Sequence, residues 1–332
     1  MKYEKRIKAY NKKFVRQLEE ALRVIEPFLI KAFTVFYGEE YYSQIENTIK
    51  NINYTYFLSE SLFKLLEKKS YGISQKDQRV VQYYIKYLKS LGFKCKGVSD
   101  IDKLELESLK SFVIKSPFDE ESLRYSNFLE LLSCDCPVYS IISDEEEQNF
   151  YKSILLPIFI IDLEVIIHEI NHALMIDAVA TTSEEIVMPN LFLVEECEEL
   201  FNDYIANLVL EQYILLKAPV PYALRKFEFV NTYENFFYLI ESFYYVFDKV
   251  IKRSIMTKNF NLLWEYSGKE DFDLFCILVQ KYYLQGCTEE EYNDLCELVL
   301  KMNEHALSIS SINYEDYFKE LESMGYRVRR LR

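Results

Sequence analysis

The chain has 332 residues, of which half are apolar and 28% are charged, and its net charge is −14. This composition is typical of globular proteins, and the length suffices for one large domain or two smaller ones. The acidic charge argues against nucleic acid as a partner, because counterion release on binding requires clustered Lys and Arg side chains. The one basic run, residues 326–332, is best interpreted as a short tail or strand resting on the acidic body.

Neither the amino end nor the apolar segments indicate a membrane or a secretory route. Residues 1–8 are rich in charge, and no apolar signal segment follows them. The longest apolar stretch, residues 154–161, contains Pro157 and is too short to span a bilayer. Seven cysteines show no spacing typical of a disulfide framework. We therefore expect a soluble, reduced, cytoplasmic protein without a membrane partner, and the sequence leaves its oligomeric state open.

The first third of the chain is expected to be helical. Only 7 Gly and 7 Pro accompany 28 Tyr and 24 Phe, so tight turns are few and long elements are favoured. Apolar residues spaced by three and four predict a helix over residues 3–36, and a second helix is expected over 39–51. Residues 54–58 fit either a short strand or the start of another helix. Further helices are expected over residues 75–92 and 104–113.

A small sheet is expected in the middle of the chain. Residues 136–143 have the β-branched and aromatic character of a strand, and residues 150–156 fit a second strand. The acidic run that begins at Asp144 is typical of a solvated loop or a helix start. Cys134 and Cys136 are close enough to bind a metal, but no second pair with zinc-ribbon spacing accompanies them. Free thiols are the favoured interpretation of this pair.

The second half again favours helices. Residues 180–193 suit a small hairpin or extended loop, and a helix is expected over 194–217, where Pro219 follows. Three or four helices are expected from residue 222 onward, with the aromatic stripe of residues 233–247 in the core. The chain has no Gly between Gly97 and Gly268, which argues against a phosphate-binding loop and nucleotide chemistry there.

The predicted fold class is therefore mainly α, as an α+β protein with a small sheet. Three regions are expected along the chain. They are an N-terminal helical region, a zinc-binding core, and a C-terminal helical region that can pack with the core as one catalytic domain. Their limits are residues 1–116, 117–217 and 218–332.

The most informative motif reads His168-Glu169-Ile170-Asn171-His172 and uses two of the three histidines in the chain. Four residues advance a helix by about 6 Å and return to the same face, so both imidazoles can bind one zinc ion. A Glu beside the first His can reach a water molecule in the coordination sphere of the metal. The flanks are apolar, without Gly or Pro after residue 157, and predict a buried helix. The alternative is two histidines on a half-buried helix without a metal.

A catalytic zinc site normally has three protein ligands, so a third one must be found. A metzincin-like motif would place Gly and His at positions that Met175 and Ala178 occupy, which excludes that arrangement. His305 is the only other histidine and lies far along the chain.

A carboxylate from the next helix is the alternative third ligand. That helix carries four candidates in its first turns: Glu195, Glu196, Glu198 and Glu199. Glu199 is favoured because Asp203 follows one turn later on the same face and can accept the free N–H of a ligating His. These glutamates also fit a simpler role, in which they compensate the helix dipole.

These motifs resemble the gluzincins, the thermolysin-like zinc metallopeptidases, in which His-Glu-x-x-His on one helix is completed by Glu-x-x-x-Asp on the next. The resemblance covers residues 168–172 and 199–203, and residue 198 is Glu where the family usually has Asn. It implies a zincin-like pair of active-site helices, with Zn²⁺ on His168, His172 and Glu199. It also implies that Glu169 is the general base and that Asp203 orients a ligating His.

From these motifs we expect a zinc-dependent peptidase that acts on a peptide or protein substrate, with Glu169 moving the proton from water to the leaving amine. The oxyanion donor is either His305 or a tyrosine, although a solvent-exposed helix position is the favoured role of His305. One alternative is a non-catalytic protein-interaction module that zinc stabilises. Another is a helical interaction module without a metal.

Overall fold

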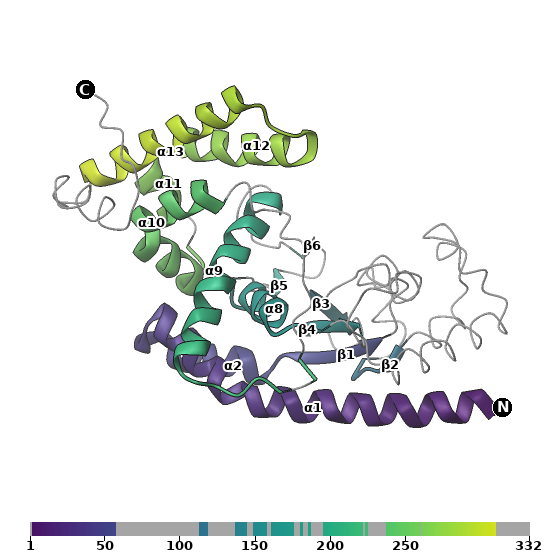
Figure 1. Ribbon diagram of the computed structural model, residues 1–332. Coiled ribbons are helices and arrows are strands. Elements are labelled where there is room, and N and C mark those ends of the chain that lie inside the picture. Colours follow the sequence, from purple (N-terminus) through teal and green to yellow (C-terminus); the bar gives the residue numbers. More distant parts are fainter. Residues whose placement is uncertain are drawn as a thin grey trace. The chain divides into compact units, whose positions relative to one another are not determined.

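Figure 1 shows the computed structural model of the chain. It describes residues 2–57, 113–118, 137–144, 149–157, 161–175, 180–181, 185–186, 195–221, 223–224, 237–259 and 261–309. Helices predominate among these residues, together with one four-stranded and one two-stranded sheet. The predicted fold class, mainly α with a small sheet, is confirmed.

The chain groups into two compact units. The first consists of Met1–Pro189 and Ile205–Val230, and the second consists of Asn190–Tyr204 and Asn231–Arg332. Helix α9 (Glu195–Leu215) is continuous and contributes residues to both units. The division into three regions that the sequence suggested stays a prediction.

The first unit begins with α1 (Lys2–Tyr37), the short 3₁₀ helix η1 (Glu39–Tyr41) and α2 (Tyr42–Lys50). Buried residues on α1 recur at helical spacing, as Leu18, Leu22, Ile25 and Leu29 illustrate. The helix ends where Gly38 adopts a φ of 124°, a conformation that glycine tolerates best, and its N–H bonds to the carbonyl of Thr34. The two helices predicted over 3–36 and 39–51 are confirmed.

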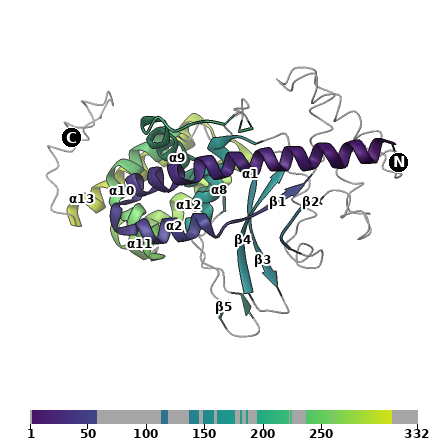
Figure 2. The same ribbon diagram turned by 90° about the horizontal axis from the view of Figure 1, so that it is seen from below.

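Four strands form the main sheet in the order β2-β1-β4-β3, and Figure 2 shows them side by side. Their bounds are Asn53–Phe57 for β1, Val113–Lys115 for β2, Val138–Asp144 for β3 and Asn149–Pro157 for β4. β1 and β4 run parallel, whereas the other two pairs are antiparallel. Ile154, Leu155 and Leu156 are all fully buried, as expected for an interior strand covered on both faces.

The strands predicted over 136–143 and 150–156 are thereby confirmed as β3 and β4. The described part of the segment at 54–58, which is residues 54–57, is a strand rather than a helix start. The helix predicted over 75–92 lies outside the described residues. So does the one over 104–113, apart from Val113, which begins β2. Cys134, Cys136 and the acidic residues after Asp144 also lie outside them.

Helix α8 (Leu163–Met175) carries the histidine motif and contacts α2, β3 and β4. It starts at an N-cap: Asp162 Oδ1 accepts the N–H of Glu164 at 3.0 Å, and the Asp162 carbonyl accepts the N–H of Ile166. After α8, β5 (Ala180–Thr181) and β6 (Glu185–Ile186) form an antiparallel pair. Of the two predicted alternatives, a small hairpin or an extended loop, this pairing favours the hairpin for the described residues.

The second unit contains α10 (Phe237–Thr257), α11 (Asn261–Ser267), α12 (Lys269–Gln285) and α13 (Glu289–Ile309). These four helices and the helix over 195–215 confirm the helices predicted for the second half. Phe243 lies at the centre of an aromatic core: its ring stacks on Phe247 at 4.2 Å and on Phe275 at 5.8 Å. The aromatic stripe is thus core where it is described. Every helix in the described part is too short or too polar to span a bilayer.

Candidate metal centre

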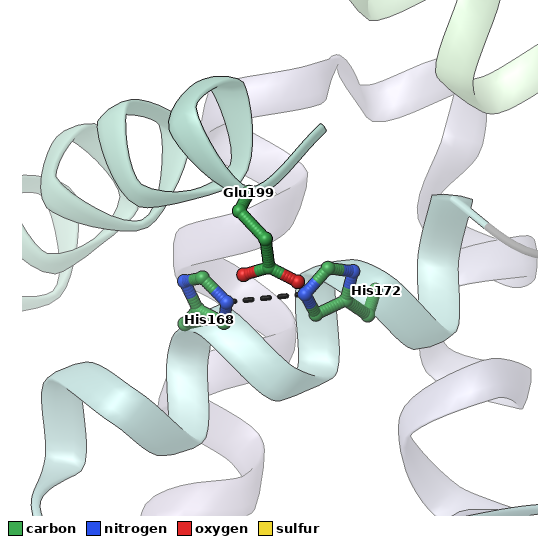
Figure 3. Close-up of side chains that lie close together, drawn as sticks. All are labelled: His168, His172 and Glu199. Atoms are coloured by element: carbon green, nitrogen blue, oxygen red, sulfur yellow. Dashed lines mark hydrogen bonds between the residues drawn. The ribbon is translucent and has the colours of Figure 1, made fainter. Parts of the chain in front are cut away.

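His168 and His172 present their imidazoles on one face of α8, one turn apart (Figure 3). The two Nε2 atoms are 3.1 Å apart, and the ring planes meet at 73°. His172 is 7% exposed, and the side chain of His168 is 12% exposed. The helix therefore turns two ring nitrogens toward the same small volume, largely screened from solvent.

Glu199 of α9 supplies a third donor. Its carboxylate points at the gap between the two imidazoles (Figure 3), and one donor atom from each of the three residues lies within 4.8 Å of the others. From the sequence, any of four glutamates at the start of this helix could be the third ligand. Among the described residues it is Glu199 that joins the histidines, as the spacing to Asp203 favoured.

The donor set fits zinc in type and in geometry. Two imidazole nitrogens and one carboxylate oxygen are ligands that zinc accepts, and three protein ligands are typical of catalytic zinc sites. Two nitrogens at bonding distance from one tetrahedral zinc are about 3.3 Å apart. The observed Nε2–Nε2 distance of 3.1 Å is close to that value, so a metal requires little movement of either ring.

Glu169 lies beside these donors and is held by the sheet. Its Oε2 accepts the backbone N–H of Tyr139 in β3 at 2.5 Å, and its Oε1 is 4.0 Å from His168 Nε2. The residue is only 6% exposed, and a buried carboxylate requires such a donor. The Tyr139 ring stacks near His172 at a centroid distance of 6.3 Å. Strand β3 therefore contacts both the acid and a candidate ligand.

Two further side chains hold α8 in place, and the sequence did not identify either. Tyr37, the last residue of α1, donates its hydroxyl proton to Asn171 Oδ1 at 2.5 Å. Asn171 lies between the two histidines in the sequence, and its side chain is fully buried. Burial raises the pKa of Tyr37 far above its usual value, so the phenol remains a neutral donor. Lys152 of β4 donates to the carbonyl of Ala173 at 2.6 Å.

Replacing Tyr37 with Phe should lower the free energy of unfolding by about 1–3 kcal/mol, because the hydroxyl that bonds to a buried amide is lost while the ring stays. Urea denaturation followed by circular dichroism measures this change. Tyr42→Phe is the matched control. Its hydroxyl bonds to Glu46 on the surface, and its loss should cost less than about 0.5 kcal/mol. Equal stability of both variants would mean that the Tyr37 bond does not secure α8.

The remaining predicted site residues are placed as follows. Asp203 is half-buried on α9, one turn after Glu199, and its role in orienting a histidine stays a prediction. His305 is exposed on α13, in keeping with the exposed helix position favoured for it, and its ring lies near Gly268. Its alternative role as an oxyanion donor stays a prediction.

The case for a metal centre thus depends on the chain's own geometry, in which three donors of suitable type converge beside a buried carboxylate. Comparison of the chain with models of protein families, with curated proteins and with solved structures gave no match.

Proposed function

We propose that the protein is a zinc-dependent peptidase that holds its metal on His168, His172 and Glu199. The observation that carries the proposal is the convergence of these three donors within 4.8 Å. Three protein ligands leave a coordination position for water or substrate. Zinc in this position supplies Lewis acidity: it lowers the pKa of water toward neutrality and polarises a carbonyl group.

Glu169 has the position and the chemistry of a general base. Its carboxylate takes a proton from the attacking water and delivers that proton to the leaving amine. The Tyr139 N–H, bonded to Oε2, fixes the position of the carboxylate. Glu169 lies next to the donors, with its Oε1 4.0 Å from His168 Nε2, but it is not one of the three residues whose donor atoms converge.

The position of β3 favours a peptide as the substrate. In the four-stranded sheet of the described residues, β3 is an edge strand. The Tyr139 N–H bonds to Glu169, and the backbone groups of Ile141 point in the same direction because alternate residues of a strand do. An extended peptide can pair with such an edge through its own backbone. Pairing there would bring a peptide bond alongside Glu169.

The burial of the site favours one alternative, a non-catalytic interaction module that zinc stabilises. His172 and Glu169 are 7% and 6% exposed, and closed zinc sites are typically structural. Against this alternative, the fourth residue near the metal position, Glu169, is an acid that lies outside the set of three donors. Structural sites instead complete their coordination with a fourth protein ligand.

The test is metal analysis combined with a peptide-cleavage assay on the full chain. We expect about one zinc per chain after purification without added metal. We also expect cleavage of a diverse peptide mixture, detected by mass spectrometry, that stops on chelation and returns with zinc. Bound zinc with no cleavage would favour the structural alternative. If the chain binds no metal, the remaining hypothesis is a helical interaction module without a metal.

A further inference from the structure

A cavity of about 460 Å³ lies within the first unit, between α1, α2 and strands β1 and β2. Its volume falls in the range of sites that bind small molecules, roughly 300–1,000 Å³. None of its lining residues belongs to the candidate metal centre, so the proposed peptidase function does not account for it.

Four charged side chains line this cavity. Two of them form an ion pair with each other, and the other two form none within the described part of the chain. Glu19 of α1 forms an ion pair with Lys115 of β2, and these two charges offset each other. Arg23 and Glu26 also line the cavity, and within the described part of the chain neither forms an ion pair. Spaced by three residues, they lie on the same side of α1. The cavity therefore offers one cation and one carboxylate that a ligand can engage.

The remaining wall is aromatic and aliphatic. Tyr54 and Tyr56 come from β1, and Leu29 and Ile49 come from the two helices. Tyr56, Leu29 and Ile49 are each at most 3% exposed, so this wall is firmly packed. Burial, with a smaller contribution from a nearby glutamate, raises the pKa of both tyrosines, which keeps the phenols neutral. Tyr54 is half-buried, so among the two tyrosines it is the one whose ring a ligand in the cavity can contact.

We propose that this cavity binds an α-amino acid with a large apolar side chain. The ammonium group lies against Glu26, the carboxylate lies against Arg23, and the side chain packs on the half-buried Tyr54. An amine or a carboxylic acid alone engages only one of the two charges and leaves the other unmatched. A free amino acid carries both charges close together, as the spacing of Arg23 and Glu26 requires.

The first test is calorimetric titration of the full chain with three compounds that share one aromatic ring. L-phenylalanine carries both charges, phenethylamine carries only the ammonium group, and 3-phenylpropionate carries only the carboxylate. L-phenylalanine is expected to bind about tenfold more tightly than either analogue, because each charged contact contributes at least that factor. The dipeptide L-phenylalanylglycine, whose charges are farther apart, should bind more weakly than the free amino acid. The same result is expected with metal-free protein, which separates this proposal from the peptidase function.

Two single substitutions test the assigned partners. Glu26→Gln should remove the preference for L-phenylalanine over 3-phenylpropionate, whereas Arg23→Gln should remove the preference over phenethylamine. The controls are Arg16→Gln and Glu20→Gln, which alter an exposed ion pair on the same helix outside the cavity and should leave affinities unchanged. Circular dichroism verifies that each variant is folded. The proposal is overturned if L-phenylalanine and L-leucine fail to bind at about 10 mM. Equal binding of all three compounds, or selectivity that neither substitution alters, also overturns it.

Discussion

Replacing Glu169 with Gln is expected to slow peptide hydrolysis by about 10²–10⁴-fold while zinc stays bound. The amide retains an oxygen that can accept the Tyr139 N–H, so the side chain keeps its anchor. It cannot accept a proton from water at neutral pH, so the general-base step is lost. Initial rates on a peptide substrate, together with zinc content by elemental analysis, measure the two effects separately.

Glu164→Gln is the matched control for this substitution. Glu164 lies in the first turn of α8, outside the converging donor set, and its replacement should leave both the rate and the zinc content unchanged. Hydrolysis by the Glu169 variant at the wild-type rate would exclude this residue as the base. Loss of zinc together with activity would show instead that Glu169 contributes to holding the metal.

Elements that arise from local patterns could be predicted from the sequence. Apolar residues on α1 repeat at the helical period because one face is buried, so its span was predictable to within about one residue. β3 and β4 follow from β-branched and aromatic composition. The His168–His172 pair depends only on helix geometry, since four residues return to the same face. Asp162, directly before an apolar run, is an N-cap signal that is visible in the sequence and that marks the start of α8.

Features that depend on tertiary packing could not be derived in this way. The four glutamates among residues 195–199 all fit the start of a helix, and which of them meets the histidines depends on how α9 is rotated about its axis. Only the spacing to Asp203 favoured Glu199, the residue that joins the donors. Tyr37 and Asn171 are 134 positions apart, and no local pattern links them. A polar Asn inside a buried helix nevertheless predicts a partner of some kind, because buried amides are rarely left unbonded.

The cavity is unpredictable for a similar reason. Its walls come from segments around residues 19–29, 49–56 and 115–117, which are distant along the chain. Arg23 and Glu26 look like ordinary surface charges on α1 when the sequence is considered alone, because helix surfaces commonly carry such pairs. That they line one cavity together with residues of β1 and β2 follows only from the tertiary structure.

Replacing Glu199 with Gln is expected to weaken zinc binding by more than about a hundredfold, since even residues that merely orient zinc ligands change affinity by 10–100-fold. The consequence for stability follows from mass action. Zinc at a hundred times its dissociation constant stabilises the wild-type protein by about 2.7 kcal/mol, or roughly 4 °C in the unfolding midpoint. At the same zinc concentration the variant should gain almost nothing, because its dissociation constant then equals or exceeds that concentration.

Thermal unfolding with and without zinc, together with a competition assay for zinc affinity, measures both effects. Glu211→Gln, an exposed glutamate on the same helix, is the matched control and should respond to zinc as the wild type does. Without zinc, the Glu199 variant should unfold near the wild-type temperature, because its role is to bind metal rather than to fill the core. A variant that still gained the full zinc-dependent stabilisation would exclude Glu199 as a ligand and return the choice to Glu195, Glu196 or Glu198. A variant that lost stability equally with and without zinc would assign Glu199 a purely structural role.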